Sequence, residues 1–242
     1  MTVGTVSQHI SKQFDNELEN IRERVLTMGG LVEQQLINAL KALTDSEVEH
    51  AQLVIRNEPQ VNALEVSIDE DCTKILARRQ PAAGDLRLVM AVIKTITDLE
   101  RIGDESEKIA KMAIDLIEKQ GPKSYYVGIN AMGNHARKMV YGSLDAFARM
   151  DTRAALDVAS EEPRSDEMYV AMLRQLITYM IEDPRNISGT IDAVWTARAL
   201  ERIADHARNI CEYVIYFVEG KDVRHISIEQ MEKEVSENNK VV

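Results

Sequence analysis

Apolar side chains recur along the first part of the chain at spacings of three and four residues. The series runs Ile10, Phe14, Leu18, Ile21, Val25, Met28, Val32, Leu36 and Leu40. This spacing places them on one face of an α-helix, so the pattern predicts a long helix over about residues 7–43. Gly29 and Gly30 fall inside it, where each glycine costs on the order of 1 kcal/mol. They indicate either a close helix contact or a bend.

Five more helices follow from the same periodicity and its breaks. Asp45 or Ser46 is the expected cap of a second helix, and Asp85 the cap of a third that ends at the Gly-Pro pair 121–122. Short connections make neighbouring helices antiparallel. The sequence therefore predicts an all-α protein of two tandem antiparallel three-helix bundles. The expected domains are residues 1–121 and 122–220, followed by a polar, mobile tail over 221–242.

Three more helices are expected in the second half of the chain. A fourth helix is expected over 124–150, a fifth up to about residue 182, and a sixth over 186–219 that stops at Gly220. Pro59 lies inside the second helix and is expected to kink or split it. Pro163 in the fifth helix matches Pro59 at an offset of 104.

One motif occurs twice and supports an internal duplication. Residues 99–109 read LERIGDESEKI and residues 200–210 read LERIADHARNI, with six of eleven positions identical at an offset of 101. Each copy holds a Glu four residues before an Asp: Glu100 and Asp104, then Glu201 and Asp205. Residues four apart share a helix face, so each copy presents two carboxylates together.

Such a pair suits a metal ion. Like charges at this spacing destabilise a helix by roughly 0.2–0.5 kcal/mol, and a bound cation would reverse the sign. Oxygen-only donors favour hard cations such as Mg²⁺, Mn²⁺ or Fe. The alternative is a solvated acidic face. A helical wheel turns both pairs away from the apolar seam, so we expect them on an accessible surface.

A third pair, Glu65 and Asp69, lies in the second helix and could join the first motif across antiparallel helices. At the offset of the two prolines its counterparts are Tyr169 and Leu173, so the spacing is lost in the second half. Asp166 and Glu167 are nearby acids. A metal site there would need other donors or would be weaker.

Composition limits the classes of function. Hydrophobic residues make up 45% of the 242 residues, aromatic residues only 5%, and the net charge is −11. Nucleic acid is not an expected partner, because it binds basic surfaces. No signal peptide or membrane-length apolar run is visible, so a soluble cytoplasmic protein is expected. Cys72 and Cys211 are expected to be buried free thiols.

Several single residues allow a sharper and a plainer interpretation. Glu47 and His50 have the Glu-x-x-His spacing of di-iron bundles, but those need two such motifs, which disfavours a redox enzyme. His206 turns away from the second acidic pair and is expected to be solvated. Trp195 and Met180 are expected in the core.

The chain resembles the PhoU family, the accessory regulators of phosphate-specific transport. Besides the two LERI motifs, the resemblance rests on TMGGLVEQQL (27–36), RRQPAAGDLRLVM (78–90) and RQLITYMIEDPR (174–185). It implies a cytoplasmic, dimeric, all-helical protein without catalytic activity. Such a protein represses the phosphate-starvation response when phosphate is plentiful.

The resemblance also implies partners and a cofactor. The partners would be the ATPase subunit of the phosphate ABC transporter, the sensor histidine kinase of the phosphate regulon and a second copy of the chain, with the membrane reached only through them. Some members bind metal through repeated Glu/Asp-x-x-x-Asp motifs, matched here by the pairs beginning at Glu65, Glu100 and Glu201. A metal-storage protein or metal-dependent enzyme without a signalling role is the alternative.

Overall fold

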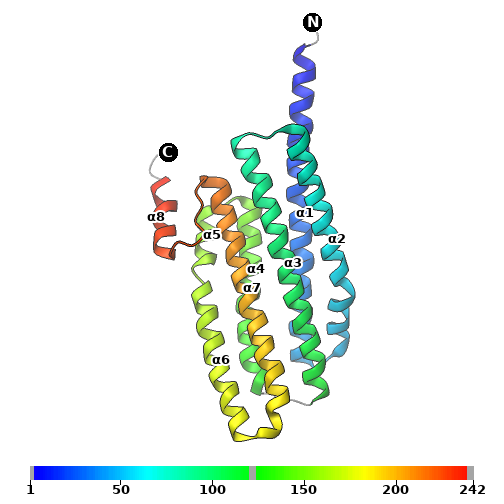
Figure 1. Cartoon of the computed structure of the whole chain (residues 1–242), viewed down its shortest axis with the longest axis vertical. Coiled ribbons are helices and arrows are strands. Elements are labelled where there is room, and N and C mark those ends of the chain that lie inside the picture. The colour runs from blue at the N-terminus through cyan, green and yellow to red at the C-terminus, as the bar shows by residue number, and fades with distance from the viewer. Residues whose placement is uncertain (1–2, 120–123, 239–242) are drawn as a thin grey trace.

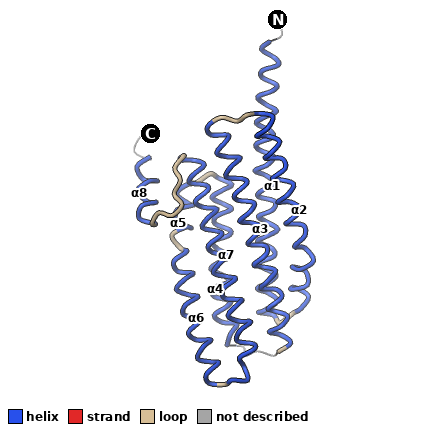
Figure 2. Tube along the Cα trace, viewed as in Figure 1, coloured by secondary structure: helices blue, strands red, loops and turns tan. Residues whose placement is uncertain are grey.

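The computed structural model describes residues 3–119 and 124–238, and within these ranges it contains helices and no strand (Figure 2). The helices are α1 (Val3–Asp45), α2 (Val48–Arg79), α3 (Ala83–Glu118), α4 (Ser124–Arg149), α5 (Thr152–Ala159), α6 (Glu162–Glu182), α7 (Ile187–Glu219) and α8 (Ile228–Asn238). A 3₁₀ turn, Pro184–Asn186, joins α6 to α7. The all-α prediction is confirmed.

The two repeats lie side by side (Figure 1). Helices α1, α2 and α3 form the first, and α4, the α5–α6 pair and α7 form the second. Helix α3 packs along α7, and α1 packs against α4. The tandem three-helix bundles are thus confirmed. The expected boundary at 121–122, and with it the expected end of the third helix, lies outside the described residues; α3 itself ends at Glu118.

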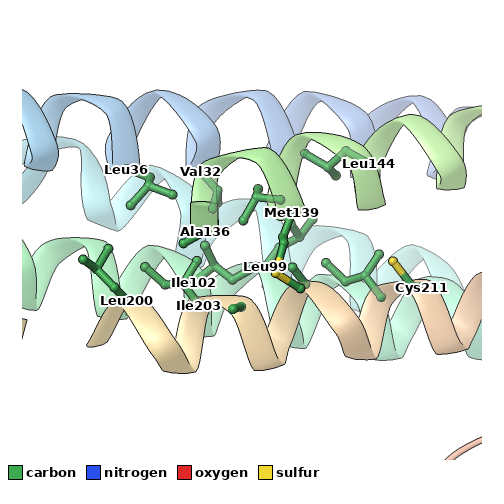
Figure 3. Close-up of a cluster of buried hydrophobic side chains, with 14 of the residues drawn as sticks. Val32, Leu36, Leu99, Ile102, Ala136, Met139, Leu144, Leu200, Ile203 and Cys211 are labelled. Carbon is green, nitrogen blue, oxygen red and sulfur yellow. The ribbon is translucent and has the colours of Figure 1, made fainter. Parts of the chain in front are cut away.

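A single hydrophobic core connects the repeats. Leu99 and Ile102 of α3 meet their repeat equivalents Leu200 and Ile203 of α7, and all four side chains are fully buried (Figure 3). Each motif therefore contributes apolar residues to the core and carboxylates to another face of the same helix.

Glycine permits the close crossing of α1 and α4. A Cβ atom at Gly29 would lie 2.5 Å from Cδ2 of Leu144, and one at Gly133 would overlap the side chain of Leu40. Gly30 has no atom within 4 Å of such a Cβ atom. Of the two interpretations of this glycine pair, close contact therefore holds for Gly29.

Two expected helix caps are wrong. Helix α1 continues through Asp45, and Ser46 reverses the chain with a φ of 58°, so Glu47 takes the N-cap position of α2 without a capping side-chain bond. Helix α3 starts after Ala82. Asp85 lies in its first turn instead, where a carboxylate still complements the helix dipole.

The two prolines behave differently. Pro59 lies inside the continuous helix α2, whereas the second half breaks between Ala159 and Glu162 and places Pro163 in the first turn of α6. A proline in a first turn removes no helix hydrogen bond, because the amide there has no intrahelical acceptor. The split expected at Pro59 therefore does not occur there, and the helix breaks instead near its counterpart in the second repeat.

The tail is ordered through residue 238, contrary to the expectation of a mobile segment. Gly220 ends α7 with a φ of 73°, as expected. Beyond it Val223, Met231 and Val235 are buried, and α8 packs against α5 and α7. Burial of these three side chains explains why the mainly polar segment stays attached. Residues 239–242 lie outside the described part.

One expected core residue is on the surface. Trp195 is 61% exposed, and Met180 is half-buried. Trp195 belongs to an exposed apolar set, which we call the α6–α7 apolar surface: Ile177, Ile181, Ile187, Ile191 and Trp195. None of the described helices has the length and apolar character needed to cross a membrane. Cys72 and Cys211 are buried and unpaired, as expected.

Candidate metal centre

The second motif lies in a cluster of four carboxylates between α6 and α7. Glu201 and Asp205 come from α7, and Glu162 and Asp166, four residues apart on α6, face them. One oxygen each of Glu162, Asp166 and Asp205 lies within 4.8 Å of the other two. In the part of the chain that the structure describes, no other three acidic, His or Cys side chains meet so closely.

Burial makes this cluster electrostatically costly. Glu201 is only 6% exposed, so the expectation of an accessible surface is wrong for it. Burial, and then the neighbouring Asp205, raises the pKa of Glu201 to about 7. Burial, followed by repulsion from Glu162 and Asp166, raises the pKa of Asp205 to about 6. Both shifts arise first from burial and then from repulsion between the carboxylates, which the lowering effect of Arg198 does not offset.

Two arginines border the cluster without neutralising it. Arg198 donates to Oε1 of Glu201 and stacks over the ring of Tyr169 at 5.6 Å. Arg208 donates to Oε2 of Glu162 at 2.6 Å and to Glu212 at 3.1 Å. Oε2 of Glu201 remains buried without a hydrogen-bond partner. A buried carboxylate oxygen without a donor is the type of atom that a cation satisfies.

The first motif forms a related but looser cluster with α2. Burial raises the pKa of Glu65, as do Asp69 and Asp104. Burial also raises the pKa of Glu100, with contributions from Asp104 and Glu65. The structure therefore brings Glu65, Glu100 and Asp104 together, while Asp69 is exposed and acts as a neighbouring charge.

Two residues of α2 occupy the positions that correspond to the acidic residues of α6. At the offset of the prolines, Glu58 corresponds to Glu162 and Asn62 to Asp166. Asn62 donates to Oε1 of Glu58, and its own Oδ1 is buried without a partner. Starting from Glu65, the repeat offset leads only to Asp166 as a nearby acid and not to Glu162; starting from Glu58 and Asn62, it leads to both positions.

The residues fit a hard divalent cation. Both clusters offer only oxygen donors, and each contains one buried oxygen without a partner. In the second cluster the holders would be Glu162, Asp166, Glu201 and Asp205. In the first they would be Glu58, Asn62, Glu65, Glu100 and Asp104. When bound, the cation supplies positive charge that joins α7 to α6 and α3 to α2.

His206 is not solvated, contrary to expectation. It is 8% exposed, and its Nδ1 lies 2.7 Å from Oδ1 of Asp98 on α3. The helical wheel correctly turned it away from Glu201. The same rotation points His206 toward α3 of the other repeat. A helical wheel drawn for α7 alone does not show that neighbour.

The geometry defines a class: a helical tandem-repeat protein with one carboxylate cluster in each repeat. Comparison with known proteins then gives the family. The family model described as PhoU domain matches residues 25–113 and 129–214, one copy in each repeat. The chain belongs to the PhoU family.

Relatives and solved structures agree over almost the whole length. The chain is 50% identical to the phosphate-specific transport system accessory protein PhoU homolog of Pseudomonas aeruginosa, over 97% of each chain. It is 45% identical to the PhoU protein of Escherichia coli (strain K12), over 94% of each.

Two crystal structures share the fold. PhoU from Pseudomonas aeruginosa superposes with a TM-score of 0.84 at 50% identity, covering 86% of this chain and 100% of that one. The phosphate transport system regulatory protein PhoU from Streptococcus pneumoniae gives a TM-score of 0.80 at 30% identity, covering 87% and 99%. The family is one of accessory proteins of phosphate transport.

Proposed function

We propose that this protein is a cytoplasmic, non-catalytic regulator of phosphate uptake that represses the phosphate-starvation response when phosphate is plentiful. The observation that carries this proposal is the family match in both repeats, together with 50% identity over 97% of a relative named for phosphate transport. Function is inferred here from a whole-chain match, which is stronger than an analogy of fold alone.

The protein acts as an adaptor. One surface contacts the ATPase subunit of the phosphate ABC transporter, and another contacts the sensor histidine kinase. Signalling is then a shift in the population of bound states, without a bond made or broken by this chain. The chain forms a homodimer, and its contact with the membrane is indirect.

The α6–α7 apolar surface is suited to one of these partner contacts. Ile181 is 76% exposed and Trp195 61%, and exposed aromatic side chains are enriched at protein interfaces. Ile187, Ile191 and Trp195 are spaced by four, so they share a face of α7.

The carboxylate clusters bind Mg²⁺, Mn²⁺ or Fe. The proposal is supported by the three oxygens within 4.8 Å of one another and by the unpartnered oxygen of Glu201. The cation would lower the repulsion between carboxylates and so favour one arrangement of α6 against α7. A metal-storage or metal-dependent enzyme is the competing function, and iron-dependent oxygen consumption by the purified protein would support it.

A deletion strain tests the regulatory role. Phosphatase expression in phosphate-rich medium is expected to be high without the protein and low again when the wild-type gene is restored. Trp195→Asp, in a folded protein, should restore repression poorly, whereas the exposed change Glu167→Gln on α6 should restore it fully. Low phosphatase expression in the deletion strain would rule out the repressor role.

A further inference from the structure

Arg208 connects the second carboxylate cluster with a carboxylate outside it. Its guanidinium donates from Nη1 to Oε2 of Glu162 on α6 at 2.6 Å, and from Nε to Oε1 of Glu212 on α7 at 3.1 Å. Both carboxylates are buried, and the arginine is half-buried between them. One cationic side chain is therefore divided between a member of the cluster and a residue two turns further along α7 than Asp205.

Glu212 lies near the segment that leads from α7 to α8. Burial raises the pKa of its carboxyl group, whereas Arg208 and then His225 of that segment lower it. Val223 of the same segment is fully buried, and α8 packs beyond it against α5 and α7 (Figure 1). The end of the chain is thus docked beside a buried carboxylate, and Arg208 offsets part of the cost of keeping that charge from water.

The first repeat has no equivalent of this contact. At the offset of the repeated motif, Arg208 corresponds to Glu107 and Glu212 to Lys111, so both charges are reversed. Glu107 and Lys111 pair with each other at 2.6 Å on the surface of α3. An arginine that joins a carboxylate cluster to a second buried acid is therefore specific to the repeat that α8 follows.

The charge of Glu162 determines how Arg208 is divided. Glu162 holds the guanidinium less strongly when its charge is removed or is shared with a cation. Arg208 is then free to close on Glu212 with two parallel N–H donors, which is the strong geometry of arginine–carboxylate pairs. Better neutralisation of Glu212 lowers the cost of its burial, so the segment before α8 stays closed more firmly.

We propose that Arg208 transmits the charge state of the second carboxylate cluster to α8, so that neutralising the cluster tightens the docking of this helix. The coupling is reciprocal: docked α8 raises the cation affinity of the cluster by the same factor. The inference deepens the cation site proposed above and rests on it for its natural signal. The arginine contact itself consists of side chains of this chain and can be tested without a metal.

Hydrogen exchange of the α8 amides, followed by mass spectrometry on the full chain in EDTA, tests the contact directly. Glu162→Gln removes the charge and keeps the size of the side chain, so exchange over residues 228–238 should slow roughly fivefold, because docked α8 opens less often. Asp166→Asn is the matched control. It removes a charge from the same cluster, leaves both hydrogen bonds of Arg208 in place and should change the exchange rate much less.

Two further variants show whether the effect passes through the arginine. Combined with Arg208→Met or with Glu212→Gln, the substitution Glu162→Gln should no longer slow exchange in α8. Glu212→Gln takes away a buried charge, so this variant folds even if Arg208→Met does not. A purely structural role of Arg208 would loosen α8 but would leave the response to Glu162→Gln intact.

Mn²⁺ tests the natural signal. Saturating Mn²⁺ should slow exchange of α8 roughly fivefold in the wild type and should have no effect on it in Arg208→Met or Glu212→Gln. Arg198→Met is the control, because it removes the arginine that donates to Glu201 and leaves the contacts of Arg208 unchanged. In this variant Mn²⁺ should still slow the exchange.

The outcomes separate the coupling from the cation site and from the regulatory role, since neither transporter nor kinase is present. Mn²⁺ that binds in calorimetry but leaves α8 exchange unchanged would overturn the coupling and keep the site. If Mn²⁺ does not bind, a response to Glu162→Gln that depends on Arg208 still supports the coupling, and the cation site is lost. Unchanged exchange in Glu162→Gln, or slowing that persists without Arg208, would also overturn the coupling.

Discussion

The side chain of Leu144 lies against Gly29 so closely that a Cβ atom on that glycine would be 2.5 Å from Cδ2 of the leucine. The repeat equivalents, Leu40 and Gly133, form the reciprocal contact in the same helix crossing. The duplication thus supplies two matched glycine–leucine contacts where α1 meets α4, and each holds the two helices at short distance.

We expect Gly29→Ala to destabilise the protein by about 1 kcal/mol, because overpacking forces the Leu144 side chain from its position. The change should remain small, since only the end of a flexible side chain must move. Urea unfolding followed by circular dichroism measures it.

Gly30→Ala is the matched control. No atom lies within 4 Å of the added Cβ atom, so alanine should stabilise the protein by about 0.5–1 kcal/mol through its helix propensity. Equal effects of the two substitutions would contradict the close contact.

The helices and the repeat could be predicted from sequence, but the crossing could not. Apolar periodicity gives each helix and the axis along which its stripe runs. It does not show which apolar face packs against which helix. From the sequence alone, Gly29 could therefore mark either a bend or a close helix contact. The exposure of Trp195 could not be predicted for the same reason. Its large apolar side chain favours burial, but the sequence does not show that no other described helix packs on this face of α7.

The candidate site was predicted in part for a related reason. Glu201 and Asp205 could be found because the motif repeats along the chain. Their partners Glu162 and Asp166 are brought in by the packing of α6 on α7, and the sequence signal for them was the offset shared with Glu58. His206 was misjudged because its partner Asp98 comes from the other repeat.

Acidification should stabilise the metal-free protein. The pKa of Glu201 rises from 4.5 to about 7, so between these values the folded protein binds more protons than the unfolded chain. The free energy of unfolding therefore falls as pH rises through this window, and the cost is complete above about pH 7. Asp205, with its pKa raised to about 6, acts in the same direction.

Glu201→Gln should remove much of this dependence. At pH 8 in EDTA it should stabilise the protein by on the order of 1 kcal/mol, and at pH 5 its effect should be close to zero. Urea unfolding at the two pH values measures the difference, with the exposed Glu167→Gln as a control that changes neither. A wild-type protein more stable at pH 8 than at pH 5.5 would contradict the argument.

Helix α8 should detach when its buried contact is made polar. Met231 is fully buried, and an aspartate there would place a charge against α5 and α7. Met231→Asp should speed tryptic cleavage after Lys221 and Arg224 by about tenfold or more, since cleavage follows local opening.

The exposed neighbour Lys233→Asp introduces the same side chain on the solvent face of α8 and should leave the cleavage rate unchanged. Because the other helices share one core without α8, global unfolding of the Met231→Asp protein should stay cooperative. Slow cleavage in both variants would mean that burial of Met231 does not hold the helix.

The two repeats should differ in metal affinity because of one pair of equivalent positions. Asp166 gives the second cluster a carboxylate where Asn62 gives the first a neutral amide. Each added carboxylate near a divalent cation strengthens binding, and ligand charge is a main determinant of affinity at oxygen sites. With Mn²⁺ as the probe, calorimetry should therefore find a tighter and a weaker site.

Exchanging these residues should exchange the affinities. Asp166→Asn should weaken the tighter site roughly tenfold, and Asn62→Asp should strengthen the weaker one by a similar factor. Glu201→Gln with Asp205→Asn should abolish the tighter site and leave the other, which assigns each binding event to a repeat.

Asp69→Asn removes an exposed carboxylate beside the first cluster and should change Mn²⁺ binding much less than Asn62→Asp does. If neither exchange alters Mn²⁺ binding, the carboxylates of both motifs are a bare acidic face, and the raised pKa of Glu201 is then a cost that no cation offsets.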